Sequence, residues 1–197
     1  MRAEEGILVL LRELGMTQPM SKWKLVNSAA VFQSPWLEVK KKAYLQEGLS
    51  GEQDYYVVER LPFVVVVALH QTDLLMVRHF RHGTDETYLE LPAGYRDGGE
   101  SAIAAAQREL LEETGYEAGT STLLGELHPL PGYIRSSASV VLCRDLRDTG
   151  TVIDANEIEQ VLRVPATQVI QMILRGEINE MQAVSAILLA HASSPLC

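Results

Sequence analysis

The sequence predicts an α/β protein, or α+β in a stricter classification, in which a mixed β-sheet carries helices on its faces. Short β-rich segments alternate with helical ones along the 197 residues, and 47% hydrophobic content is enough to bury a core. The apolar run FVVVVAL at residues 63–69 is typical of a strand buried on both faces. We therefore expect one principal domain with a smaller appendage.

The first 60 residues predict an N-terminal extension followed by a separate β unit. Residues 1–20 form the extension, which lacks the basic flank and cleavage site of a signal peptide. The unit at 21–60 is predicted to be an antiparallel three-stranded meander with strands at 22–32, 36–46 and 54–60. Because three short strands alone are marginally stable, this unit needs another surface to pack against.

Residues 61–197 predict the principal domain. After the strand at 63–69, the expected strands are 73–78, 88–93, 123–130 and 137–146. The expected helices are 102–114, 165–177 and 180–192.

The helix predicted at 102–114 has clear boundaries and two distinct stripes. Ser101 is a suitable N-cap and Gly115 a suitable stop. Helical spacing places the apolar side chains on one stripe, which we expect to face the core: Ile103, Ala106 and Leu110.

Glutamates form the second stripe of this helix. Glu109, Glu112 and Glu113 are spaced i, i+3 and i+4, so their carboxylates converge, and the small Ala102 and Ala105 are expected to leave room beside them. Like charges about 4 Å apart repel by about 4 kcal/mol at an effective dielectric near 20. A hard divalent cation would reverse that repulsion, and oxygen ligands select Mg²⁺ or Mn²⁺. A solvated Glu-rich face is the alternative.

The segment from Gly94 to Tyr116 resembles the Nudix box over its whole length. Five residues separate Gly94 from Glu100, and seven more precede Arg108-Glu109-Leu110. Glu112-Glu113 and Gly115-Tyr116 complete the pattern, in which only Tyr116 is larger than the usual aliphatic residue. The sequence is therefore identified as a member of the Nudix hydrolases, which cleave a nucleoside diphosphate linked to a group X.

The resemblance implies an α/β/α sandwich in which the box forms a loop-helix-loop. It implies that Mg²⁺ or Mn²⁺ is bound by Glu109, Glu112, Glu113 and the backbone carbonyl of Ala93. Arg108 and Glu100 would hold the loop and ligands in place. In much of the family a glutamate on a later loop is the general base. The candidate loop here is 149–161, with Glu157 the better match and Glu159 the second.

Outside the box, the chain resembles the ADP-ribose pyrophosphatase branch from Lys22 to about Ala192. The resemblance rests on the N-terminal three-stranded unit, residues 77–94 before the box, and Pro131 beyond it. Members of this branch are typically homodimers that exchange their N-terminal strands, so a homodimer is expected. This exchange would also cover the faces of the unit at 21–60.

The branch resemblance also implies substrate contacts. Trp36 and Tyr56 would stack on adenine, although strand packing is an equal alternative for both. Arg60 and Arg81 would contact phosphate or the terminal ribose. Many relatives carry an acidic residue after Pro131-Gly132, where this chain has Arg135 and serines, so its contacts to the sugar are expected to differ. ADP-ribose is favoured, with another ADP-sugar, GDP-mannose or a UDP-sugar left open.

Composition excludes some other functions. The formal net charge of −9 argues against a partner that is nucleic acid. No segment approaches the roughly 18 to 20 apolar residues that span a bilayer, so no membrane partner is expected. The two cysteines, Cys143 and Cys197, favour a reducing cytoplasm. A non-catalytic Nudix sensing module and a hydrolase of damaged nucleoside triphosphates remain alternatives to a nucleotide-sugar diphosphatase.

Overall fold

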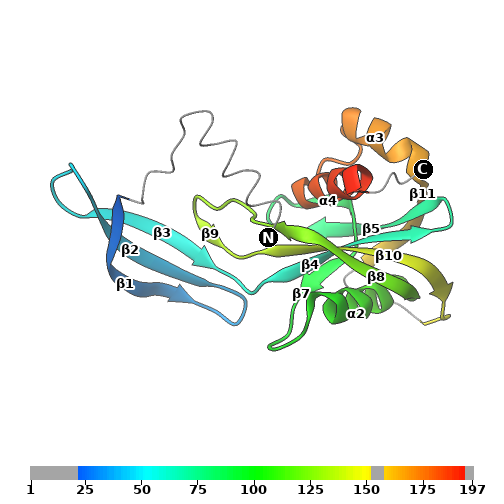
Figure 1. Cartoon of the computed structure of the whole chain (residues 1–197), viewed down its shortest axis with the longest axis horizontal. Coiled ribbons are helices and arrows are strands. Elements are labelled where there is room, and N and C mark those ends of the chain that lie inside the picture. Colours follow the sequence, from blue (N-terminus) through cyan, green and yellow to red (C-terminus); the bar gives the residue numbers. More distant parts are fainter. Residues whose placement is uncertain (1–21, 152–157, 194–197) are drawn as a thin grey trace. The chain divides into compact units, whose positions relative to one another are not determined.

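The computed structural model describes residues 22–151 and 158–193, and the chain divides into two compact units between Val58 and Glu59 (Figure 1). In the described part of the chain, no helix combines the length and apolarity needed to cross a membrane.

The first unit contains the three predicted strands. They are β1 (Trp23–Gln33), β2 (Glu38–Gln46) and β3 (Gln53–Glu59), adjacent in that order. β1 and β2 are antiparallel, with Trp23 opposite Gln46 and Gln33 opposite Glu38. β1 is exposed along its whole length, including large side chains such as Val31 and Phe32. Much apolar surface of this sheet is therefore exposed among the described residues.

The second unit is built on a seven-stranded mixed sheet in which β4 (Phe63–His70) is central. Its five principal strands follow the order β11-β5-β4-β10-β8, and β6 pairs with β5 while β7 pairs with β4. Only the β4–β10 pair is parallel among the pairs with described registers in this sheet. The remaining bounds are β5 (Asp73–Arg81), β6 (Glu86–Glu90), β7 (Ala93–Tyr95), β8 (Tyr116–Leu127), β9 (Ile134–Arg135), β10 (Ala138–Asp148) and β11 (Ile158–Pro165).

Helices cover both faces of this sheet: α2 (Ala102–Thr114) on one, and α3 (Ala166–Leu174) with α4 (Met181–Ser193) on the other (Figure 1). Side chains of β4 alternate between two cores, because successive strand residues point to opposite faces. Val64 and Val66 pack in the α2 core, and Val65 and Val67 in the α3/α4 core; all four are buried. This confirms the α/β/α sandwich.

Most predicted elements are confirmed, but the predictions at 88–93, 123–130 and 149–161 need correction. The single strand expected at 88–93 is divided between β6, which ends at Glu90, and β7, which begins at Ala93. The strand expected at 123–130 is β8, which begins at Tyr116, directly after the αL residue Gly115 that ends α2. The loop expected at 149–161 ends earlier, because β11 begins at Ile158 and pairs with β5.

The predicted faces of α2 are partly wrong. Ala106 and Leu110 face the core as expected, but Ile103 is 39% exposed. Ala105, expected to leave open space on the glutamate stripe, is fully buried against the sheet. The buried face is therefore rotated towards the glutamates, and it includes Glu109 and Glu113.

Candidate active site

The helix α2 carries the glutamates, and its two ends are fixed by local interactions. The Ser101 side chain accepts a hydrogen bond from the Ala104 N–H at 3.1 Å, a cap worth about 1 kcal/mol. At the other end, Gly115 has φ of 75°, and its N–H donates to the Leu111 carbonyl at 2.9 Å. These interactions fix which residues of α2 face the loop that precedes the helix.

Two buried carboxylates of α2 press against the short strand β7. The Ala93 N–H donates to Glu113 Oε2 at 3.0 Å. A Cβ added at Gly94 would lie only 2.0 Å from Glu109 Oε1, so glycine is required for this approach. Glu109 and Glu113 are 8% and 7% exposed, which is unusual for carboxylates. The backbone of β7 and the face of α2 thus form a carboxylate-lined recess, hereafter the cradle.

Arg108 ties the cradle to the loop before α2. Its Nη1 donates to Glu109 Oε1 at 2.7 Å and to Glu112 Oε2 at 3.0 Å. Its Nη2 donates to the Tyr95 carbonyl at 2.8 Å, and Nε and Nη2 both contact the Glu100 carboxylate. Hydrogen bonds to Glu100, then Glu109, raise the Arg108 pKa far above its ordinary value. Arg108 is therefore a permanent cation among three carboxylates.

Glu100 fixes the loop itself. Besides Arg108, it accepts a hydrogen bond from the Asp97 N–H at 3.2 Å, and its carbonyl accepts one from Arg96. The hydrogen bonds from Arg108, then from the Asp97 backbone, lower the pKa of the Glu100 carboxyl. Glu100 is thus held ionised at the entrance to the helix.

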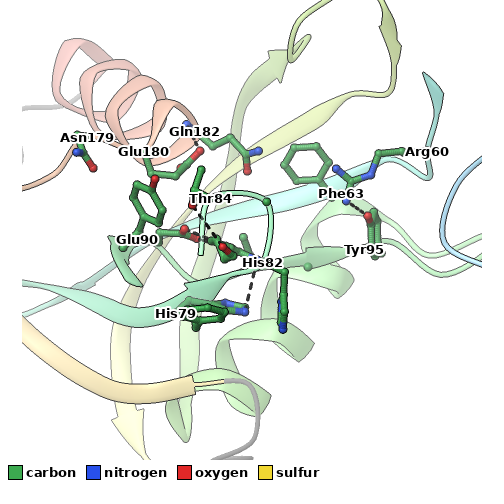
Figure 2. Close-up of a pocket in the computed structure, with 16 residues that line it drawn as sticks. Arg60, Phe63, His79, His82, Thr84, Glu90, Tyr95, Asn179, Glu180 and Gln182 are labelled. Carbon is green, nitrogen blue, oxygen red and sulfur yellow. Dashed lines mark hydrogen bonds and ion pairs between the residues drawn. The ribbon is translucent and has the colours of Figure 1, made fainter. Parts of the chain in front are cut away.

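A cavity of about 650 Å³ opens beside the cradle. It includes Ala93, Gly94 and Tyr95, so the loop that touches the buried glutamates also forms the cavity wall. Its other lining residues are Arg60, Phe63, His79, Phe80, Arg81, His82, Gly83, Thr84, Tyr88, Glu90, Asn179, Glu180 and Gln182 (Figure 2). All of these residues belong to the second unit.

A second guanidinium–carboxylate pair lies in the cavity. Arg81 Nε donates to Glu90 Oε1 at 2.9 Å and to Oε2 at 3.1 Å, and Nη2 also donates to Oε2. The Glu90 side chain is 4% exposed and that of Arg81 is 40% exposed. Burial lowers the Arg81 pKa, but the hydrogen bonds and charge of Glu90 outweigh this and raise it. Arg81 therefore stays charged, and its Nη1 lies 3.5 Å from His79 Nε2 in the same cavity.

The donor set suits a hard cation chemically. Around Arg81, Arg96 and Arg108, carboxylates outnumber guanidinium groups five to three: Glu90, Glu100, Glu109, Glu112 and Glu113. Such an excess of negative charge, all on oxygen, is what Mg²⁺ or Mn²⁺ compensates. Within the described ranges, however, no group of three or more His, Cys, Asp or Glu side chains is arranged so that it could hold a metal ion in this structure.

The structure brings together only some of the predicted substrate residues. Arg60 and Arg81 both line the cavity, and the Arg60 guanidinium stacks 5.3 Å from the Tyr95 ring centroid while bonding its hydroxyl. Trp36 and Tyr56 lie in the first unit, where they are 73% and 60% exposed.

The two candidate bases have different outcomes. Glu157 lies outside the described residues. Glu159 is exposed in β11 and accepts a hydrogen bond from the Thr87 hydroxyl at 3.2 Å. Thr87 does not line the cavity, but the residue before Glu159, Ile158, pairs with the cavity residue His79.

Sequence reasoning missed several residues of the cavity. Glu90 had a detectable signal, because it is a carboxylate within the otherwise apolar segment LELPA before the box. Asn179, Glu180 and Gln182 had none, since they precede or begin a predicted helix far along the chain from the box.

Comparisons with known proteins agree with this geometry. A family model described as the NUDIX domain matches residues 59–184. The ADP-ribose pyrophosphatase of Mycobacterium tuberculosis (strain ATCC 25618 / H37Rv) is 35% identical over 141 residues, 69% of this chain and 68% of the relative. The ADP compounds hydrolase NudE of Escherichia coli (strain K12) is 32% identical over 126 residues, 64% of this chain and 68% of the relative.

A solved structure described as an ADP compounds hydrolase superposes with a TM-score of 0.78 at 25% identity, covering 91% of this chain and 100% of that one. The fold similarity thus extends beyond the residues matched by the family model. With the box, the sandwich and these matches in agreement, this chain belongs to the Nudix family.

Proposed function

We propose that this protein hydrolyses the diphosphate of ADP-ribose, or of a related nucleotide sugar, to a nucleoside monophosphate and a sugar phosphate. The observation that carries the proposal is the cradle: buried Glu109 and Glu113 against β7, directly beside a cavity containing Arg81. Carboxylates that recruit a cation and a guanidinium that binds phosphate are the groups that diphosphate cleavage requires. The names of the relatives agree with this reaction class.

Magnesium, with manganese as a substitute, is the proposed metal. Its ligands would be Glu109, Glu112, Glu113 and the carbonyl of Ala93. When bound, the ion would shield phosphate charge and lower the pKa of a water molecule. Arg108 Nη1 contacts one oxygen of Glu109 and one of Glu112, so the second oxygen of each carboxylate would be the one that meets the ion.

The protein's own groups would orient the substrate. Arg81, held on Glu90, presents a fixed guanidinium that suits bidentate binding of a phosphate. Arg60, stacked on Tyr95, supplies a second cation to the same cavity. Arg108 and Glu100 keep the loop of Tyr95 in place, so that the reacting atoms stay aligned.

Glu157 is the proposed general base that accepts a proton from the attacking water. Glu159, whose carboxylate accepts a hydrogen bond from the Thr87 hydroxyl, is the second candidate. Glu157→Gln is expected to slow single-turnover hydrolysis by about 100-fold or more, the usual contribution of a general base, while leaving Mg²⁺ affinity unchanged. Glu159→Gln is the matched control. A slow Glu159→Gln with a normal Glu157→Gln would reverse the assignment.

A substrate panel tests the reaction itself. ADP-ribose, ADP-glucose, GDP-mannose, a UDP-sugar and a nucleoside triphosphate are each incubated with Mg²⁺ or Mn²⁺, and the products identified. We expect AMP and ribose 5-phosphate from ADP-ribose, and no turnover with excess chelator. A preference for GDP-mannose or the UDP-sugar would move the substrate assignment. Binding without turnover of any compound would indicate a non-catalytic module.

We also propose a homodimer that exchanges the strands of the first unit. It is supported by the apolar side chains that β1 leaves exposed, including Phe32 at 57%. Phe32→Glu is expected to shift the dimer to monomer in light scattering, because a buried charge is costly at such an interface. Leu174→Glu, at a side chain 73% exposed on α3, is the control. A monomeric wild-type protein at micromolar concentration contradicts this proposal.

A further inference from the structure

The cavity has two chemically different walls. One wall is ionic and lies beside the cradle, with Arg81 paired to Glu90. The other is formed by the N-terminal turn of α4, where Gln182 contributes a neutral amide (Figure 2). A charged diphosphate is bound by cationic groups such as the guanidinium on the first wall. Uncharged hydroxyl groups are bound by neutral donors and acceptors such as the amide on the second wall.

Two side-chain amides on this wall have no hydrogen-bond partner among the described residues, and of these Gln182 is half-buried whereas Asn179 is exposed. Glu180 uses both carboxylate oxygens to cap α4, accepting from the N–H groups of Gln182 at 3.0 Å and Ala183 at 2.8 Å. The Thr84 hydroxyl donates to the Arg81 carbonyl, and the Tyr88 hydroxyl to Glu86. Among the described residues, the half-buried side-chain amide of Gln182 has no hydrogen-bond partner.

The turn that carries Gln182 also lies close to the phosphate-binding side of the cavity. The charge of Glu180 is among those that act on Arg81, together with those of Glu90 and Glu113. Gln182 and Arg81 line the same cavity, so a group that contacts Gln182 would share that cavity with a phosphate bound at Arg81.

We propose that Gln182 determines specificity by hydrogen-bonding a hydroxyl of the group X esterified to the diphosphate, so that the cavity selects a sugar over an apolar alcohol. The inference rests on the proposed function and adds to it a residue and a substrate feature. A half-buried amide that hydrogen-bonds a hydroxyl loses that bond when the hydroxyl is absent, which disfavours analogues without it.

The test compares two substrates and two matched variants. ADP-ribose carries hydroxyls on X, whereas the butyl ester of ADP has none. Gln182→Met keeps the length of the side chain and removes its hydrogen-bonding groups. We expect it to lower kcat/KM for ADP-ribose about 5-fold, the effect of losing one hydrogen bond, and to change that for the butyl ester less than about 2-fold. Gln168→Met, on the exposed side of α3, is expected to alter neither.

Calorimetric affinities for the same two ligands, measured with Ca²⁺ in place of Mg²⁺, separate this inference from the proposed function. Absence of turnover in the wild-type protein would overturn the proposed function. The loss of affinity caused by Gln182→Met for ADP-ribose, compared with its loss for the butyl ester, would then still test the role of Gln182. Equal losses on both ligands would place Gln182 on the nucleoside side and overturn the inference. The inference would also be overturned if Gln182→Met left both kcat/KM and the affinities unchanged, or if the wild-type protein bound neither ligand.

Discussion

The cradle and the cavity are neighbours that share β7, yet they are assembled in opposite ways. The cradle comes from one continuous segment, in which Arg108 gathers Glu100, Glu109 and Glu112 within a loop and a single helix. The cavity collects residues from positions 60–63, 79–90, 93–95 and 179–182. Functional residues that lie in one continuous segment can be recognised in the sequence by their spacing. Functional residues that are brought together only by tertiary folding cannot.

The two sites also use arginine differently. Arg108 contacts three carboxylates and the Tyr95 carbonyl, which engage its Nε, Nη1 and Nη2 atoms. Arg81 is held by one buried carboxylate and lines open space. The first arrangement suits a structural cation that fixes ligands, and the second suits a cation that meets a substrate. Substitutions in the two sites should therefore affect different kinetic constants.

The largest effect is expected in the cradle from Glu113→Gln. The substitution keeps an acceptor for the Ala93 N–H, so the fold should persist, but it removes a charge from the proposed metal site. Metal ions contribute several kcal/mol to the transition state, so kcat should fall by about 1,000-fold. Steady-state kinetics with a Mg²⁺ titration measures this. Glu117→Gln, at an exposed residue paired with Arg147, is the control. Near-normal turnover of Glu113→Gln would remove Glu113 from the metal site.

Gly94→Ala should be the next most damaging change. The new Cβ would lie about 2 Å from the Glu109 carboxylate, so that side chain must move while the backbone stays. A displacement of about 1 Å at a reacting centre costs about 100-fold in rate. Circular dichroism and kcat together check that activity is lost without unfolding.

Gly83→Ala provides the matched control for Gly94→Ala on the cavity side. A Cβ at Gly83 meets nothing within 4 Å, so its activity should stay within about 2-fold of wild type. Similar losses in both variants would mean that crowding at Glu109 is not the cause.

The same contrast explains how much could be predicted from sequence. Ser101, Gly115 and the 3.6-residue period define α2 to the residue, because caps and periodicity are local signals. Ile103 was assigned to the core because it is apolar, but the helix rotates to bury Ala105 and the glutamates against β7. The glutamates are therefore buried in place of the more hydrophobic Ile103. The pattern of apolar residues in the sequence does not predict this orientation of the helix.

Long-range pairing accounts for the other differences. β11 forms because Ile158 and the following residues match β5, a pairing across about half the chain that local propensity does not reveal. Gln182 reaches the cavity because α4 packs against the face of β4, so its role depends on tertiary contacts alone. The family pattern could not identify it either, since its fixed positions end at Tyr116.

On the cavity side, Arg81→Lys should produce an intermediate effect. Lysine keeps the charge but loses the planar fork that binds Glu90 and a phosphate together. Loss of one charge-assisted hydrogen bond should raise KM for ADP-ribose about 10-fold and leave kcat within about 3-fold. Arg147→Lys, in an exposed pair with Glu117, controls for the exchange itself. A fall in kcat with unchanged KM would place Arg81 in the chemical step instead.

The smallest expected effect concerns Glu100 and appears in the pH dependence of stability. Hydrogen bonds from Arg108 and the Asp97 N–H lower the Glu100 pKa in the folded protein below its ordinary value of 4.5. The unfolded chain therefore binds this proton more readily, so the stabilisation is present above pH 4.5 and disappears as the pH falls through the folded pKa. Glu100→Gln cannot titrate, so its Tm should lie below that of wild type at pH 7 and approach it near pH 3. The difference should also shrink in 1 M NaCl, because part of it is electrostatic. A Tm difference independent of pH would mean that Glu100 holds the loop through shape and neutral hydrogen bonds, and the cradle would then owe its geometry to Gly94 and Arg108 without the ionised carboxylate.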